Sequence, residues 1–130
     1  MNSSFHFLKE DYPELFAICE ISEQLITIDP SSTLAKARLF SEKLTRLVWD
    51  FEEMGDFLGT QVDRINRLHY SNILPDIVKG ILHTIRKSGN DAAHEGTGSK
   101  EQAHFILKKC FQLAKWFYET YNYDTVAIST

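Results

Sequence analysis

The last third of the chain carries an apolar repeat that fits one long α-helix. Ser99 and Gln102 match the Ser-x-x-Gln capping box that begins many helices. Apolar residues then recur at helical spacing: Ala103, Ile106, Leu107, Cys110, Leu113, Ala114, Phe117 and Tyr121. A helix with such a stripe buries it against other elements, so the stretch predicts a core helix.

Four other stretches carry helix signals of the same kind. The expected helices are one from Asp11 to about Ile26, one from Ser31, Ser32 or Thr33 to about Met54, one from Thr60 with Asp63 to about Tyr70, and one from Pro75 through Ile85. Gly80, inside the fourth of them, is expected where a partner helix approaches closely.

These helices define the expected architecture. We find no strand pair and no internal repeat, so the sequence predicts an all-α fold, a single bundle of about five helices. Residues 1–124 are assigned to the bundle, with Phe5, Phe7 and Leu8 packed over it. Residues 125–130 are assigned to a tail or to the start of a linker to further domains.

Charge and cysteine content narrow the classes of function. The 130 residues carry 14 Lys and Arg against 18 Asp and Glu, a net charge of -4, which gives no global footprint of a nucleic-acid-binding domain. Cys19 and Cys110 lie at apolar positions of expected helices and form neither a disulfide framework nor a zinc motif. The cysteine usage therefore favours a reducing, cytoplasmic setting. No membrane span is expected, because no apolar run approaches roughly 20 residues.

Residues 83–98 hold the densest polar cluster of the chain. Arg86, Asn90 and His94 are spaced i, i+4 and i+8, so in a helical path they drift only about 40° per step and share one side. Gly89 followed by Asn90 is a usual way to end a helix, because both residues tolerate the left-handed conformation. The polar groups are therefore expected at a junction between two helices.

The three polar side chains support two interpretations. They serve phosphate chemistry if Arg86 clamps a phosphate, Asn90 orients it and His94 moves a proton. In the structural interpretation, Arg86 interacts with the last carbonyls of its helix, Asn90 forms the turn and His94 hydrogen-bonds a neighbouring helix. The spacing alone leaves both interpretations open.

No metal or cofactor is expected in this domain. The string HEGTG at 94–98 lacks the second His of the HExxH zinc motif, and the remaining histidines show no ligand spacing. GTGS at 96–99 precedes a helix but lacks the preceding strand and the Lys of a phosphate-binding loop.

Three strings resemble a known family. Residues 5–44, residues 81–95 (ILHTIRKSGNDAAHE) and residues 107–121 (LKKCFQLAKWFYETY) together resemble the helical module at the N-terminus of type I restriction enzyme R subunits and related helicases. The most specific matches are Lys36, Arg38, Glu42, Ile85, Arg86, Gly89, Asn90, Ala92, His94, Trp116 and Phe117.

The resemblance implies a setting for the polar residues. The parent protein would be an ATP-dependent type I site-specific deoxyribonuclease, and the partners would be other domains or subunits of a restriction complex. One ligand-binding or structural network would include Lys36, Arg38, Glu42, Arg86, Asn90 and His94.

That module is in turn similar to the HEPN superfamily of helical bundles, many of which are metal-independent ribonucleases. Asn90 and His94 match the Asn and His of the HEPN motif, whereas its Arg is replaced by Gly89 and Arg86 lies one turn upstream. In these ribonucleases the Arg and His manage phosphate charge and proton transfer during attack by the 2′-OH of the substrate. The superfamily fold also implies a two-helix dimerising face, and hence a homodimer.

The resemblance and the polar cluster support three functions. The first is a non-catalytic accessory domain in DNA restriction and defence, which docks domains, partners or nucleic acid while a nuclease and motor elsewhere in the parent cut DNA. The second is an HEPN-type endoribonuclease that uses Arg86 and His94. The third is a sensor of a small ligand or nucleotide at the same cluster, which binding would stabilise without turnover.

Overall fold

The structure, a computed structural model, describes residues 3–122. Its elements in chain order are the 3₁₀ turn η1 (His6–Leu8) and the helices α1 (Pro13–Leu25), α2 (Pro30–Phe51), α3 (Gln61–Tyr70), α4 (Asp76–Glu95) and α5 (Lys100–Tyr121). These described residues contain five α-helices and no strand, which confirms the predicted all-α bundle. The expected tail at 125–130 lies outside them.

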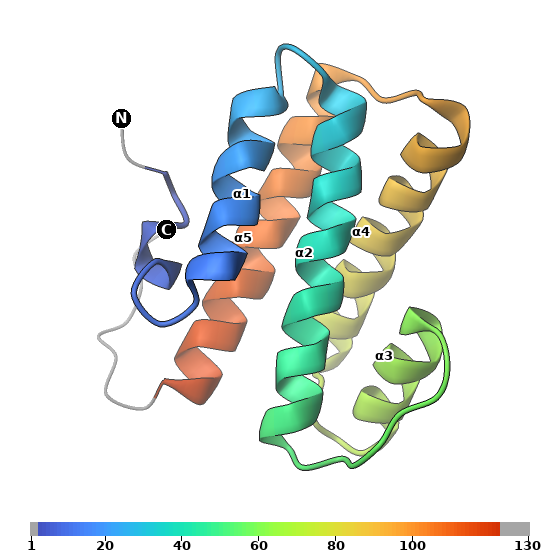
Figure 1. Cartoon of the computed structure of the whole chain (residues 1–130). Helices are drawn as coiled ribbons and strands as arrows, with labels where there is room; N and C mark the ends of the chain where they lie inside the picture. The colour runs from blue at the N-terminus through green and yellow to red at the C-terminus, as the bar shows by residue number, and fades with distance from the viewer. Residues whose placement is uncertain (1–2, 123–130) are drawn as a thin grey trace.

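Helix α2 is the central element of the bundle. It contacts α1, α3, α4 and α5, and the four longer helices lie side by side in Figure 1. Helices α2 and α4 run in opposite directions, and the short α3 packs against both of them. Helices α2, α3 and α4 contact one another and form one corner of the bundle.

The capping signals located two helix starts correctly. The Thr60 hydroxyl accepts a hydrogen bond from the Asp63 backbone N–H at 3.2 Å, and the Asp63 carboxylate accepts one from the Thr60 N–H at 2.9 Å. Ser99 and Gln102 form the same reciprocal pair at 3.1 and 2.8 Å. Because both boxes satisfy backbone donors that the helix leaves free, they fix the first turns of α3 and α5.

Two other helix starts were predicted wrongly. Tyr12, not Asp11, precedes α1, and the Asp11 carboxylate instead accepts a hydrogen bond from the Tyr118 hydroxyl at 3.2 Å. Helix α2 begins at Pro30 and is capped by Asp29, whose side chain accepts from the Ser32 N–H at 3.3 Å. The pair Asp29-Pro30 therefore starts the helix ahead of the three expected caps, because proline has no N–H to lose in the first turn.

The N-terminal segment is part of the core, as predicted. Phe5 is 2% exposed, and its ring makes edge contacts with Phe40 at 6.2 Å and Phe111 at 5.9 Å between centroids. Phe51 is 47% exposed, because it is the last residue of α2. Its ring still stacks on that of Phe117 at 6.1 Å.

The described helices show neither a membrane span nor a metal-binding group of side chains. Within residues 3–122, no helix has the length and apolar character needed to cross a membrane. Among the same residues, no group of three or more His, Cys, Asp or Glu side chains is placed to hold a metal ion.

Candidate functional site

Helix α4 runs without a break through the polar stretch. The predicted helix end at Gly89 and Asn90 is wrong, since the helix continues to Glu95. It ends at Gly96, which adopts the left-handed conformation with φ 63° and donates its N–H to the Ala92 carbonyl at 2.9 Å. The polar residues therefore lie along a helix face and not at a junction between two helices.

Gly89 is needed for packing. It is buried against α2, and a Cβ added there would lie 2.5 Å from the Arg38 Cβ and 3.0 Å from the Leu34 carbonyl oxygen. Real Cβ atoms essentially never approach other atoms to 2.5 Å. The absence of a side chain at this position lets the backbones of α2 and α4 come together.

Arg38 connects the two helices beside this contact. Its Nη1 donates a hydrogen bond to Asn90 Oδ1 at 2.7 Å, and its Nε lies 3.7 Å from Glu42 Oε1. Arg38 and Glu42 are spaced i, i+4 and form an ion pair on the face of α2 toward α4. Lys36 is half-buried and lies about 200° around the helix from Arg38, so the structure does not bring it to this contact.

Arg86 and His94 flank Asn90 at opposite ends of the polar face. Arg86 is half-buried and its Nε has no hydrogen-bond partner among residues 3–122. His94 is exposed in the last turn of α4. Their backbones are about 12 Å apart along the axis, so the structure joins Arg38, Glu42, Gly89 and Asn90 but does not bring His94 to them.

Two residues that the sequence did not single out have shifted pKa values, Arg64 of α3 and His83 of α4. Arg64 of α3 lies over the Phe57 ring, 4.4 Å from its centroid, and its Nη1 donates to Gln61 Oε1 at 3.2 Å. Burial lowers the pKa of Arg64, as does the neighbouring Arg46. Burial also lowers the pKa of His83, with further lowering by the positive charges of Arg86 and Lys79. The apolar periodicity predicted the helices, but it did not predict which residues of different helices face each other.

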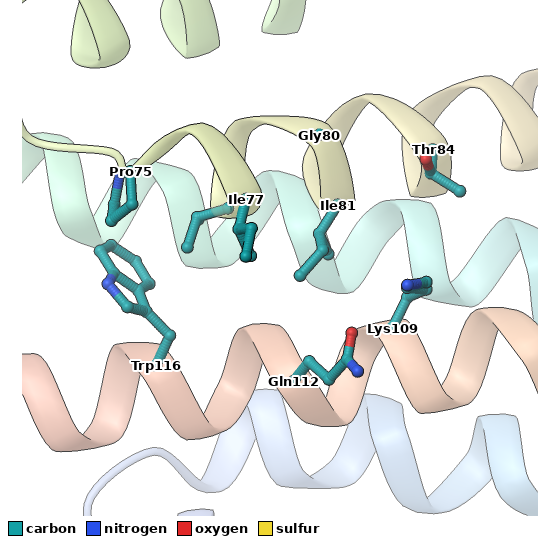
Figure 2. A pocket seen from close by; sticks show the side chains of 9 residues that line it. Pro75, Ile77, Gly80, Ile81, Thr84, Lys109, Gln112 and Trp116 are labelled. Carbon is teal, nitrogen blue, oxygen red and sulfur yellow. The ribbon is translucent and has the colours of Figure 1, made fainter.

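A hollow of about 680 Å³ lies on another side of the molecule, between α4 and α5. Figure 2 shows Ile77, Ile81 and Trp116 along it, and none of the predicted site residues lines it. Gly80 also lines this hollow, and a Cβ added there meets no atom within 4 Å. The expected close approach of a partner helix at Gly80 is therefore wrong, and the close approach occurs at Gly89.

Comparison with known proteins places this helical bundle in a family. The chain belongs to the family described as domain of unknown function (DUF4145), whose model matches residues 20–123. It is also 30% identical over 129 residues to the protein named type I restriction enzyme EcoKI endonuclease subunit from Escherichia coli (strain K12). The match covers 94% of this chain and 10% of that subunit, so the chain spans about a tenth of its relative. No solved structure matches.

Proposed function

We propose that this chain is a non-catalytic helical accessory domain of a protein like the type I restriction endonuclease subunit. In this role it docks other domains or subunits while a nuclease and an ATP-driven motor elsewhere in the parent cut DNA. The observation that carries the proposal is the similarity over 94% of the chain to a tenth of such a subunit. We propose a cytoplasmic location for the domain, because the similar subunit belongs to a bacterial restriction enzyme.

The α2–α4 contact supports a structural use of the polar residues. Gly89 allows the two backbones to meet, and the Asn90 side-chain oxygen accepts from Arg38. A metal-independent ribonuclease needs an Arg and a His at one phosphate, within hydrogen-bond reach of the reacting atoms. Arg86 and His94 are two helical turns apart, with Asn90 already engaged between them.

The HEPN-type ribonuclease remains a second candidate because of Arg86. Its Nε is buried without a partner in the described chain, and a guanidinium in this state is available to an anion. His94 is exposed and so is accessible to a substrate strand. A sensor of a small ligand or nucleotide is the third candidate and uses the same unpaired donor.

A cleavage assay separates the accessory domain from the ribonuclease. The purified chain is incubated with labelled single-stranded RNA and DNA in the presence of EDTA, beside the variants His94→Ala and Arg86→Ala. We expect no cleavage by any of the three proteins. Metal-free RNA cleavage that both substitutions abolish, in variants with unchanged circular dichroism, would overturn the proposal and establish the ribonuclease.

Docking needs a positive test of its own. The chain is mixed with the separately expressed remainder of its parent subunit, and complex formation is followed by sedimentation velocity. We expect the chain and the remainder of the subunit to form a complex, and we expect the isolated chain not to associate with itself. Sedimentation of the two parts as independent species would contradict docking, and self-association alone would indicate a homodimer.

A further inference from the structure

The described chain contains four buried side-chain nitrogen atoms without a hydrogen-bond partner, and all four belong to α2, α3 and α4. They are Arg38 Nε, Arg64 Nε, His83 Nδ1 and Arg86 Nε. Leaving a buried donor unpaired costs about 1–3 kcal/mol, and more for a charged group. Arg38 Nε has Glu42 Oε1 at 3.7 Å, beyond hydrogen-bond distance, and no ion pair is found for Arg64 or Arg86 among residues 3–122. These donors lie on three helices that contact one another, and they point to an acceptor that the described residues do not provide.

Contacts across the helices bring these arginines to one corner. Arg38 reaches Asn90 of α4 at 2.7 Å and Glu42 of its own helix at 3.7 Å. Arg64 of α3 is connected to the same part of α2, because its Nη1 donates to Gln61 Oε1 at 3.2 Å and Gln61 Nε2 donates to the Thr45 hydroxyl at 2.7 Å. Thr45 lies three residues after Glu42, and the Glu42 carboxylate acts to raise the pKa of Arg64.

Helix geometry places Arg86 on the facing turn. Helices α2 and α4 are antiparallel (Figure 1) and meet where Arg38 contacts Asn90. Glu42 lies one turn after Arg38, and Arg86 lies one turn before Asn90, so the two residues occupy opposing turns of the pair. The guanidinium of Arg86 also acts on His83, which lies on the same helix.

The charge at this corner is unbalanced. Arg38, Arg64 and Arg86 bring three positive charges, and Glu42 supplies one negative charge. Arg46 and Asp50, the two other charged groups that act on Arg64, bring one charge of each sign. The corner therefore carries an excess of at least two positive charges, because Lys79 also acts on His83, although the whole chain has a net charge of -4.

We propose that Arg38, Arg64 and Arg86 form a binding site for a phosphate monoester, which we name the three-arginine site. A monoester dianion carries about two negative charges at neutral pH and three acceptor oxygens, which match the charge excess and the three forked donors. A carboxylate or a phosphodiester carries one charge and leaves the excess half compensated. The ligand is thus a free nucleotide or the phosphorylated end of a strand.

The site is accessible and its donors are held in place. The Arg38 side chain is 34% exposed and that of Glu42 is 28% exposed, so the corner is open to solvent while partly desolvated. Asn90 fixes Arg38, and Phe57 with Gln61 fixes Arg64. Donors held in this way lose little freedom on binding, which favours affinity.

The test is calorimetric titration of the chain with inorganic phosphate, against chloride at equal ionic strength. The variants are Arg64→Gln and Arg86→Gln, and Arg67→Gln is the matched control because Arg67 is exposed on α3. We expect phosphate-specific binding that each site variant weakens at least about tenfold and the control leaves unchanged. Phosphate binding that is absent, or equal in all four proteins, would overturn the proposal.

Further ligands distinguish the sources of the phosphoryl group. Adenosine 5′-monophosphate represents a free nucleotide, and oligothymidylates with and without a 5′-phosphate represent a strand end. Binding of the phosphorylated oligonucleotide but not of its unphosphorylated form supports the strand end. Equal binding of the two oligonucleotides would refute the proposal that the site binds a phosphate monoester. Binding of oligoglutamate, with no binding of any of the phosphate ligands, would also refute it and would show that the corner binds an acidic peptide. Each outcome is independent of the docking proposal.

Discussion

Replacing Gly89 with alanine is expected to destabilise the bundle, although alanine is the better helix former. The new Cβ would lie 2.5 Å from the Arg38 Cβ and 3.0 Å from the Leu34 backbone oxygen. Neither atom is the free end of a flexible side chain, so the clash can be relieved only by moving α2 away from α4. That movement would also stretch the 2.7 Å hydrogen bond between Arg38 and Asn90.

The magnitude follows from two opposing terms. Exchange of an interior helical glycine for alanine gains about 1 kcal/mol of helix propensity. Overpacking of a tight contact costs about 1–3 kcal/mol, and a clash with backbone belongs at or above the upper end of this range. We therefore expect the free energy of unfolding of Gly89→Ala to fall by about 2 kcal/mol, which lowers Tm by roughly 5–10 °C for a domain of this size.

Gly80 provides a matched control on the same helix. An added Cβ meets no atom within 4 Å there, so Gly80→Ala should gain about 1 kcal/mol from propensity alone. Urea unfolding of both variants, followed by circular dichroism, measures the two changes under identical conditions. The reasoning would be refuted if Gly89→Ala were as stable as the unchanged protein, or if the two substitutions shifted stability in the same direction.

Three further substitutions or treatments test the core and its charges. Phe5→Ala should lower the free energy of unfolding by about 3 kcal/mol in urea titrations, because Phe5 is 2% exposed; a loss below about 1 kcal/mol would remove the N-terminal segment from the core. Burial raises the pKa of the Cys19 and Cys110 thiols, so iodoacetamide should label them in denaturant and spare them in the folded chain. Burial and two cationic neighbours lower the pKa of His83, so stability present above about pH 6.5 should be lost as the pH falls through the folded pKa, and His83→Gln should flatten this dependence.

Capping motifs and apolar periodicity predicted most of the fold, because a few adjacent residues determine where a helix starts. The boxes at Thr60 and Ser99 occur where expected, since each pairs side chains with backbone three residues away. The two wrong starts came from choosing among nearby caps. Asp11 has another partner, Tyr118, far along the chain, and Asp29 precedes a proline that suits the first turn of a helix.

The site could be predicted only within single helices. Spacing placed Arg86, Asn90 and His94 on one side of a helix, as the structure has them. Spacing carries no information on the register between α2 and α4, so the contact of Arg38 with Asn90 could not be predicted. Arg64 was missed for the same reason, because Glu42, Arg46 and Asp50, the charged groups that act on it, lie on α2.

The α2–α4 contact explains some residues of the polar string and leaves others unexplained. Packing requires the absence of a side chain at Gly89, and Ala92 is buried. The Asn90 side-chain oxygen accepts a hydrogen bond from Arg38. These identities suit any chain that packs α4 on α2 in this way, whether or not it has a catalytic activity. Neither the unpaired Nε of Arg86 nor the exposed ring of His94 is accounted for by this contact.

This division determines which variants are informative about function. A change at Asn90 removes an interhelical hydrogen bond and so confounds stability with any loss of activity. His94→Ala removes an exposed side chain, for which a stability change within about 0.5 kcal/mol is expected. A functional effect of His94→Ala at unchanged stability would therefore report on chemistry or binding alone, whereas the same effect of a change at Asn90 would not.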